Sequence, residues 1–253
     1  MRHNSTVLFR GPSRFDDKPI VALYTERSKN EKTGPMGQLA IMLEDVHPTE
    51  GVKSGLDVSV CGGCGLAGDR GCYVNTLFGP GQAWKAYKSG KANEFDSDYF
   101  KMISDYQPTR LGSYGDPAAI PRDVLGLVIG KAGHTGYTSS WQRDDVQEYR
   151  DILSASVHTM QEYVQAKRIG WKVYFTPLDD TDPAAIGLTL CPASTEAKKA
   201  RDDAGKSNRV TCADCLLCSG SGKPTNDIYS PMHGGRAVMS KIDMLKRQYA
   251  EKT

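Results

Sequence analysis

Residues 55–75 read GLDVSVCGGCGLAGDRGCYVN, a short apolar run that leads directly into a glycine-rich loop with three cysteines. The run at residues 55–60 predicts a β-strand, and the glycines predict an exposed turn. In parallel α/β folds, chemically active side chains lie in the loops that follow the carboxyl ends of the strands. This stretch therefore predicts both an α/β fold and the first part of a functional site.

The rest of the chain alternates between strand-like and helix-compatible runs. Upstream, three apolar runs separated by polar turns predict strands at residues 6–10, 19–25 and 37–43. Downstream, the predicted strands are 109–117, 134–141, 151–157, 172–177 and 187–194. The predicted helices are 82–106, 122–133, 159–170, 182–187 and 236–252.

This alternation decides the expected architecture, because strands that alternate with helices form parallel βαβ units. About seven or eight such units in roughly 200 residues predict a (β/α) barrel-like fold, a partial or irregular TIM-type barrel, rather than an open sheet. We expect a single domain over residues 1–253, with a β-rich N-terminal extension at 1–54. The barrel-like core and its C-terminal helix would occupy residues 55–253.

Composition narrows the class of protein. The 253 residues are 39% hydrophobic and 25% charged, which is ordinary for a soluble globular protein. A net charge of +2 lacks the basic excess of a dedicated nucleic-acid binder. No apolar stretch is long enough for a membrane span, and the N-terminus lacks the apolar segment of a signal peptide, which predicts a cytoplasmic protein. In that reducing compartment, clustered cysteines indicate metal or redox sites rather than disulfides.

All seven cysteines fall into two groups. The first group is Cys61, Cys64 and Cys72, and the second group is Cys191, Cys212, Cys215 and Cys218. A Cys-x2-Cys step brings two thiolates to one ion, so both groups are candidate metal ligands. Zinc and iron–sulfur clusters accept four thiolates equally well, but the run C-x2-C-x2-C at 212–218 is more typical of iron–sulfur ligation. A group of three leaves one coordination position open for a small molecule.

Two features near the first group extend the pattern. Tyr73 follows Cys72 directly, and GSYGDP at residues 112–117 ends the next predicted strand. A strand-end loop with three cysteines and an aromatic residue, followed by a glycine-rich loop after the next strand, resembles the core of radical SAM enzymes. In that superfamily three cysteines ligate a four-iron cluster whose remaining iron binds S-adenosylmethionine. The spacing here is C-x2-C-x7-C, where C-x3-C-x2-C is usual in the superfamily.

The resemblance implies a role for each motif. The first cysteine group would hold a 4Fe–4S cluster, and the second group looks like the auxiliary cluster of many superfamily members. The segment in place of the superfamily's GGEP-like stretch would position S-adenosylmethionine, with Asp116 and the Gly115 backbone as contacts. Its residues are Gly112, Ser113, Tyr114, Gly115, Asp116 and Pro117. His233 is a further candidate contact, because the two glycines that follow it permit close approach of the backbone to a ligand.

Most of the chain also resembles cysteine-rich proteins encoded by phages and plasmids. The segments GSYGDPAA, GYTSSW and CPAS…CADCLLCSG carry this resemblance. It implies no particular activity, and it would place the protein in the cytoplasm of a host cell.

Two functions are compatible with these observations. The favoured one is a radical SAM-like enzyme with one or two 4Fe–4S clusters and S-adenosylmethionine as its small-molecule cofactor. The alternative is a non-catalytic accessory protein, stabilised by zinc or an inert cluster, that binds a host protein or nucleic acid. A third arrangement, one metal centre shared by both cysteine groups, requires thiols of the two groups within about 10 Å of each other. Trp84 and Tyr87 could stack on nucleic acid, but an amphipathic helix that packs both inward is favoured.

Overall fold

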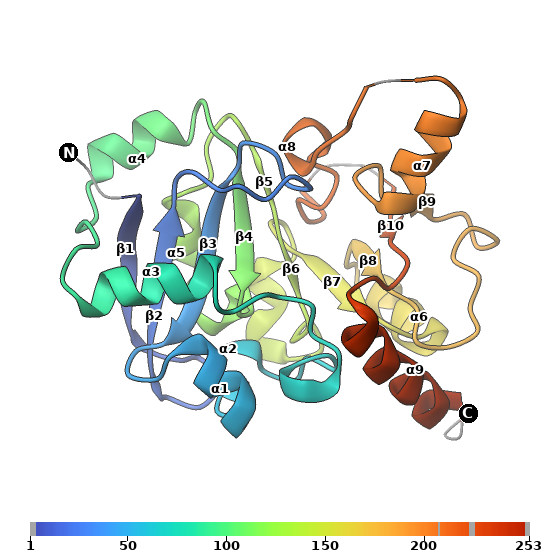
Figure 1. Ribbon diagram of the computed structural model, residues 1–253, viewed down its shortest axis with the longest axis horizontal. Helices are drawn as coiled ribbons and strands as arrows, with labels where there is room; N and C mark the ends of the chain where they lie inside the picture. Colours follow the sequence, from blue (N-terminus) through green and yellow to red (C-terminus); the bar gives the residue numbers. More distant parts are fainter. Residues whose placement is uncertain (1–3, 207, 223–225, 251–253) are drawn as a thin grey trace.

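Two five-stranded sheets form the framework of the molecule (Figure 1). The computed structural model describes residues 4–206, 208–222 and 226–250. Neighbours in the first sheet follow the order β1-β2-β3-β4-β5. Its strands are β1 (Ser5–Pro12), β2 (Pro19–Thr25), β3 (Gly37–Leu43), β4 (Thr109–Tyr114) and β5 (His134–Thr135). The first three strands pair antiparallel, whereas β3, β4 and β5 pair in parallel.

The three N-terminal strands form where the sequence predicts them, and β2 and β3 have the predicted bounds. All seven residues of β3 are buried, as its continuous apolar sequence predicts for a central strand. Because β3 pairs with β4, the N-terminal strands are continuous with the parallel part of the fold.

The second sheet is entirely parallel and has the order β6-β7-β8-β10-β9. Its strands are β6 (Tyr137–Thr138), β7 (Ser154–Val157), β8 (Val173–Phe175), β9 (Thr189–Leu190) and β10 (Ile228–Tyr229). Only Gly136 separates β5 from β6, so one short segment passes from the first sheet to the second. A Cβ at Gly136 would lie 2.7 Å from Cδ2 of Leu153 and 2.9 Å from Cβ of Leu111, so a side chain has no room there. The predicted mixed α/β class is confirmed.

Helices connect the strands and cover the sheets. The α-helices are α1 (Pro48–Ser54), α2 (Val58–Cys61), α3 (Gly79–Lys88), α4 (Ser97–Ile103), α5 (Arg122–Gly126), α6 (Met160–Arg168), α7 (Thr195–Asp203), α8 (Cys212–Cys215) and α9 (Arg236–Ala250). Short 3-10 helices are η1 (Gly68–Arg70), η2 (Pro117–Ala119) and η3 (Asp144–Tyr149). α3 packs on β1, β2 and β3, and α6 packs on β7 and β8. Within the described ranges, no helix has the length and apolar character needed to cross a membrane.

The strand predicted at residues 55–60 is wrong. Gly55 ends α1 with a φ of +72°, and α2 begins three residues later at Val58. Val60 is fully buried while Val58 is half exposed, so a single helical turn rather than a strand buries the apolar side chain. Cys61 consequently ends a helix instead of following a strand.

Three predicted helices also differ from the structure. The helix predicted at 82–106 is two helices, α3 and α4, separated by Gly90 with a φ of +69°. The helix predicted at 122–133 ends at Gly126, because glycine destabilises a helix interior. In place of the helix predicted at 182–187, residues 183–187 form turns. These differences change connections and leave the parallel strands in place.

The aromatic residues of α3 pack inward, as the amphipathic interpretation predicts. Nε1 of Trp84 donates a hydrogen bond to the carbonyl of Leu43 (3.1 Å), and the hydroxyl of Tyr87 donates to Glu44 (2.5 Å). Both side chains therefore fix α3 on the sheet and are not free to stack on nucleic acid.

Candidate functional site

A pocket of about 130 Å³ lies at the carboxyl ends of the parallel strands. Residues that directly follow β4, β6, β7, β8 and β10 line it. They are Gly115, Asp116, Ser139, His158, Thr176 and Ser230. The three cysteines of the first group line the same pocket. The candidate site thus lies where the geometry of parallel α/β folds predicts it.

Hydrogen bonds within the first cysteine loop hold its backbone in place. Cys61 ends α2, and Gly62 follows with a φ of +55°, a conformation that favours glycine. A Cβ at Gly62 would lie 2.6 Å from Oγ of Ser140. The N–H of Cys64 donates to the carbonyl of Cys61 (3.2 Å), and the guanidinium of Arg70 donates to the carbonyl of Cys64 (3.0 Å). The loop therefore has one defined path around the pocket.

The C-terminal helix covers this loop. Ile242 and Leu245 of α9 form a small hydrophobic cluster with Leu66 of the loop, and Cys64 packs against that cluster. Ile242 is fully buried, and Leu66 and Leu245 are each 9% exposed. α9 therefore shields this side of the cysteine loop from water.

All seven cysteines are free thiols. Burial raises the pKa of Cys61, Cys64 and Cys72. For Cys61 the neighbouring thiols and the carboxylate of Asp57 raise the pKa further. A negative charge on these thiols is therefore costly unless a cation lies beside them.

The glycine-rich loop after β4 reaches the same pocket. Every residue of the predicted segment 112–117 lines it except Pro117. Gly115 has a φ of +77°, and a Cβ there would lie 2.5 Å from the carbonyl oxygen of Ile41 on β3. Glycine is thus required at this position for close packing against the neighbouring strand.

Asp116 joins three segments of the site through its hydrogen bonds. Its N–H donates to the carbonyl of Val60 in α2 (2.6 Å), and its Oδ1 accepts from the N–H of Ala118 (3.0 Å). Its Oδ2 accepts from Oγ1 of Thr138 and from the N–H of Ser139, both at 2.9 Å. Burial raises the pKa of Asp116, and these hydrogen bonds oppose that shift. The carboxylate is satisfied by the protein, so it positions the two loops.

His158, directly after β7, presents an unpaired ring nitrogen at this pocket. Its Nδ1 lies 3.0 Å from the carbonyl oxygen of Thr176 and 2.9 Å from the hydroxyl of the same residue. Because the carbonyl oxygen only accepts, we assign the proton to Nδ1. Its Nε2 is buried and has no hydrogen-bond partner in the described part of the chain. Burial lowers the pKa of His158, which favours the neutral ring. A neutral imidazole with Nδ1–H held by a backbone carbonyl and Nε2 free is typical of a metal ligand.

His233, the other predicted contact, also lines the pocket. Its ring packs against Tyr73 of the cysteine loop with 4.6 Å between ring centroids. The Nζ of Lys32 lies 3.1 Å from its Nε2. Because an ammonium group only donates, Nε2 accepts and the ring is neutral. Burial, and then the charge of Lys32, lower the pKa of His233 in agreement with this state.

The second cysteine group comes from other segments of the chain, because Cys191 directly follows β9 and the other three thiols lie in and just after α8. The N–H of Cys212 donates to the carbonyl of Lys32 (3.1 Å), and the N–H of Gly136 donates to the carbonyl of Cys218 (2.7 Å). In Figure 1, α8 lies near the start of β4 and α2 lies near its end. After burial, the groups that raise the pKa of Cys218 are the other three thiols of this group. The structure therefore contains two separate groups of thiols.

A layer of aromatic side chains lies between the two groups. The rings of Tyr137 and Tyr174 stack with 4.7 Å between centroids and line the pocket of the first group. They also pack in a hydrophobic cluster with Cys191 and Cys218 of the second group. The guanidinium of Arg110 donates to the hydroxyl of Tyr137 (2.7 Å). Sequence reasoning missed these two tyrosines and Arg110, because no local pattern indicates which strand residues meet across a sheet.

The donor atoms of both groups fit a soft metal. Three thiols line one pocket and four thiols lie together elsewhere, and thiolates are preferred ligands of zinc and of iron–sulfur clusters. In the residues that the structure describes, no set of three or more His, Cys, Asp or Glu side chains is arranged ready to hold a metal ion. Metal binding would therefore require the side chains to turn toward the ion.

Comparison with known proteins identifies no family for this chain. No family model, no curated protein and no solved structure matches it. Its function is therefore inferred from the geometry of the site.

Proposed function

We propose that the protein is an iron–sulfur enzyme of the radical SAM type. The observation that carries this proposal is the meeting of the Cys61, Cys64 and Cys72 loop with residues 112–116 in one pocket. The cysteine loop follows β3 through α1 and α2, and the glycine-rich loop follows β4, the parallel neighbour of β3. The resemblance noted in the sequence implies this same order of elements.

The strand arrangement supports a partial barrel. Parallel pairing runs from β3 through β4 to β5 and, after Gly136, from β6 through β7 and β8 to β10 and β9. A series of parallel strands with helices between them is what a curved, incomplete (β/α) barrel requires. In such a barrel the pocket at the carboxyl ends is the expected active site.

The first cysteine group would hold a 4Fe–4S cluster. Such a cluster would supply the electron for cleavage of S-adenosylmethionine to methionine and a 5′-deoxyadenosyl radical, and this radical would abstract hydrogen from the substrate. The chain's own residues would position these groups and exclude water. Asp116 fixes the glycine-rich loop against α2, α9 covers the cysteine loop, and His233 offers a neutral ring at the pocket wall.

The space around the pocket decides where an organic ligand would lie. A volume of about 130 Å³ is smaller than the roughly 300–1,000 Å³ of sites that enclose small organic molecules. The pocket adjoins a cavity of about 920 Å³, and the two share Tyr73, Val74, Arg110 and Ser113 as lining residues. The substrate would therefore extend from the cysteine pocket into this larger cavity.

The second cysteine group would hold an auxiliary 4Fe–4S cluster. Burial raises the pKa of Cys212, Cys215 and Cys218. The Nζ of Lys172 donates to the carbonyl of Leu217, and its positive charge opposes the shift at Cys218. This lysine would partly balance the charge of a thiolate-bound cluster.

Anaerobic purification tests the proposed function. We expect a brown protein with about eight irons per chain, because each cluster contributes about four. Its absorption should bleach on reduction with dithionite, and the reduced protein should cleave S-adenosylmethionine to methionine and 5′-deoxyadenosine. A colourless protein with stoichiometric zinc would overturn the proposal.

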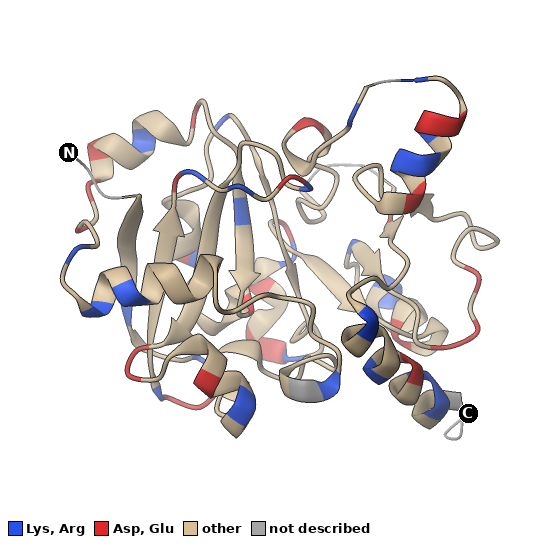
Figure 2. Ribbon diagram, in the orientation of Figure 1, with Lys and Arg blue, Asp and Glu red and all other residues tan. Residues whose placement is uncertain are grey.

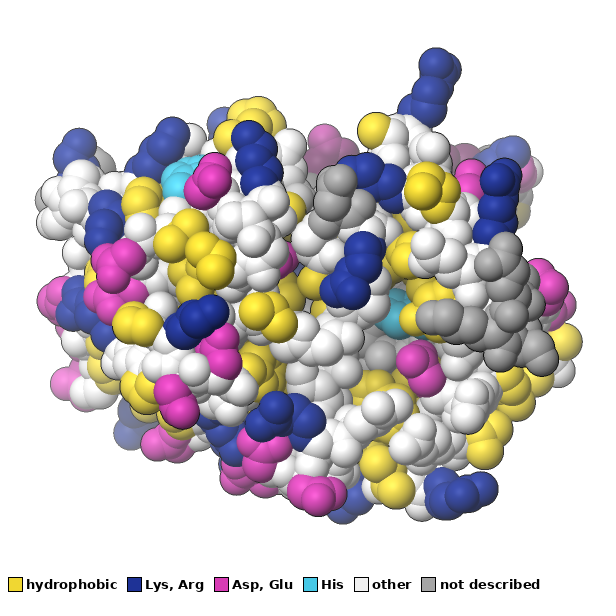
Figure 3. All heavy atoms as spheres, turned by 90° about the horizontal axis from the view of Figure 1, so that it is seen from below, with side chains coloured by type: hydrophobic (Ala, Val, Ile, Leu, Met, Phe, Trp, Pro, Cys, Tyr) yellow, Lys and Arg dark blue, Asp and Glu magenta, His cyan; other side chains and the backbone are white. Residues whose placement is uncertain are grey.

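A structural metal site is the second candidate, and the free Nε2 of His158 favours it. With Cys61, Cys64 and Cys72, this nitrogen would complete a four-ligand Cys3His set, which is typical of structural zinc. The protein would then be a metal-stabilised accessory factor that binds a host protein or nucleic acid. Such a factor needs a continuous docking surface. On the face that Figure 3 draws, hydrophobic side chains alternate with charged ones.

Replacing His158 with alanine distinguishes the two candidates. An open cluster site needs no protein ligand besides the thiols, so we expect His158→Ala to keep its full metal content. His134→Ala is the matched control, because His134 is a buried histidine that lies outside the pocket lining. Metal quantification of both purified variants is the measurement. Loss of metal from His158→Ala alone would favour the structural site.

A further inference from the structure

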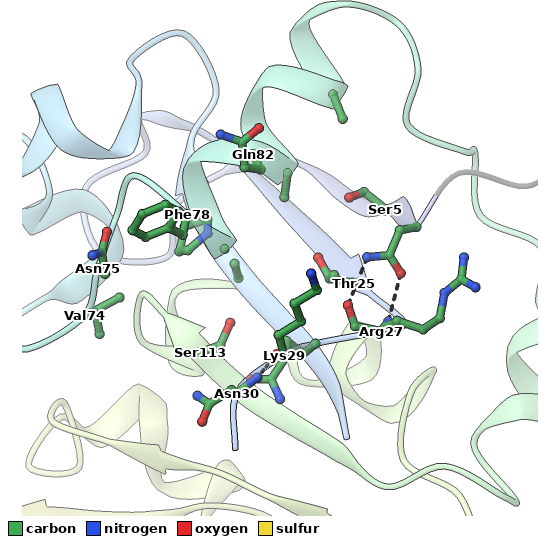
Figure 4. A pocket seen from close by; sticks show the side chains of 18 of the residues that line it. Ser5, Thr25, Arg27, Lys29, Asn30, Val74, Asn75, Phe78, Gln82 and Ser113 are labelled. Carbon is green, nitrogen blue, oxygen red and sulfur yellow. Dashed lines mark hydrogen bonds between the residues drawn. The ribbon is translucent and has the colours of Figure 1, made fainter. Parts of the chain in front are cut away.

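We propose that the larger cavity binds the phosphate groups of a nucleotide and presents that nucleotide to the cysteine pocket as the substrate. The identification of the nucleotide as the substrate rests on the proposed function, whereas the binding of a nucleotide in this cavity does not. The cavity lies between α3, the connection from β2 to β3, and the end of the cysteine loop. In Figure 4, Lys29 reaches from this connection toward α3, with Phe78 and Asn75 at one end of the cavity and Arg27 at the other.

The first argument is charge. Six cationic side chains line the cavity, and no carboxylate is among its described lining residues. The six are Arg27, Lys29, Lys32, Lys85, Lys91 and Arg110. Within the described part of the chain, none of them forms an ion pair with a carboxylate. Charges of one sign lining a concave surface raise the local concentration of an oppositely charged ligand.

The acidic residues nearby are engaged elsewhere. Figure 2 shows that the connection from β2 to β3 carries acidic as well as basic residues. Glu26 accepts a hydrogen bond from the hydroxyl of Tyr99 (2.8 Å), and Glu31 pairs with Arg209 (3.0 Å). Neither carboxylate lines the cavity. The cavity therefore has a local excess of positive charge, although the net charge of the whole chain is small.

The positive charge of the cavity also indicates a ligand other than S-adenosylmethionine. S-adenosylmethionine carries a positive sulfonium group, which a lining of six cations does not favour. A molecule with several phosphate groups supplies many negative charges in a small volume, and arginine and lysine are the usual residues that bind them. The cavity of about 920 Å³ is large enough for such a ligand.

The remaining lining residues indicate a base beside the phosphates. Phe78 is 68% exposed and Tyr73 is 40% exposed, although both line the cavity. Exposed aromatic rings beside cationic groups are the usual stacking surface for nucleotide bases. Asn30, Asn75 and Gln82 add amide groups that can hydrogen-bond the edge of a base. Cations, rings and amides together indicate a nucleotide, either free or within a single strand.

Two contacts connect this cavity to the cysteine pocket. Arg110 and Tyr73 line both spaces. Lys32 lines the cavity and contacts His233, which lines the pocket. A ligand held by the cations at this wall would therefore have one end near the thiols of the first cysteine group.

Binding measurements with two probes test the proposal. We expect the protein to bind a short fluorescein-labelled oligothymidine strand or the fluorescent nucleotide mant-ATP at low salt. Fluorescence anisotropy follows the strand and fluorescence intensity follows mant-ATP. In the variant with Lys29→Glu and Lys85→Glu, affinity should fall by about tenfold or more, because two phosphate contacts become repulsive. The control, Lys53→Glu with Lys246→Glu, makes the same change in net charge at exposed positions outside the cavity.

The outcomes separate this inference from the proposed function. If the protein binds the labelled strand and ATP does not displace it, the ligand is a nucleotide within a strand. If the protein binds mant-ATP, the ligand is a free nucleotide. Each result supports the proposal if only the cavity variant weakens binding. No binding of either probe, or equal weakening in both variants, overturns it. Because Cys61→Ser leaves the cavity intact, it should bind the probes like the parent protein even if the protein holds no cluster.

Discussion

Cys61→Ser is expected to remove one cluster and to leave the other. Iron content should fall from about eight to about four per chain, and cleavage of S-adenosylmethionine should fall to background. The reason is that the first group has only three thiols, and a serine hydroxyl is a poor ligand in a set that favours soft donors. Iron and sulfide quantification, with an assay for 5′-deoxyadenosine, measures both effects.

Cys215→Ser is the matched variant for this experiment. Cys215 belongs to the second group, where the neighbouring thiols Cys191 and Cys212 contribute to the raised pKa of its own thiol. We expect it to lose the auxiliary cluster and to keep about four irons. Unchanged iron in Cys61→Ser would contradict a cluster in the first group. Complete loss of iron in both variants would indicate one shared centre, against the separate positions of the two groups in the structure.

Short-range patterns indicated the segments that line the candidate pocket. The spacing of Cys61, Cys64 and Cys72 and the GSYGDP segment each lie within about a dozen consecutive residues. The rule that active side chains follow parallel strands then placed both at one end of the sheet. This rule held even though residues 55–60 are not a strand, because the cysteine loop still follows β3 through two short helices.

Long-range contacts explain what the sequence could not predict. Arg110, Tyr137 and Tyr174 meet only because β4, β6 and β8 bring them together. The significance of His158 depends on which carbonyl its Nδ1 contacts, and that carbonyl belongs to Thr176, 18 residues later. A strand-end histidine is visible in the sequence, whereas the free nitrogen is visible only in the fold.

The sequence did not indicate the basic cavity, for a related reason. Its cations come from positions between 27 and 110, and acidic residues interrupt them along the chain. Overall net charge therefore argued against a nucleic-acid binder, although the fold gathers these cations around one cavity while Glu26 and Glu31 contact Tyr99 and Arg209 instead. Local charge within a cavity, rather than the total, decides which ligand is attracted.

Asp116→Ala is expected to destabilise the protein more than other single changes to a carboxylate. The substitution leaves the N–H groups of Ala118 and Ser139 and the hydroxyl of Thr138 without their acceptor. Each buried donor left unpaired costs about 1–3 kcal/mol, so for three donors we expect a total loss of at least about 3 kcal/mol. In a chain of this size that loss corresponds to a fall in melting temperature of about 10 °C. Thermal unfolding followed by circular dichroism is the measurement.

Two further variants show whether the hydrogen bonds are the cause. Asp116→Asn keeps one acceptor oxygen, so its loss should be intermediate between those of the parent and Asp116→Ala. Asp105→Ala removes a surface carboxylate that pairs with Lys131 (2.6 Å), and it should change the melting temperature little, because exposed ion pairs contribute little to stability. If Asp116→Ala were no more destabilising than Asp105→Ala, the carboxylate would not hold the loops together.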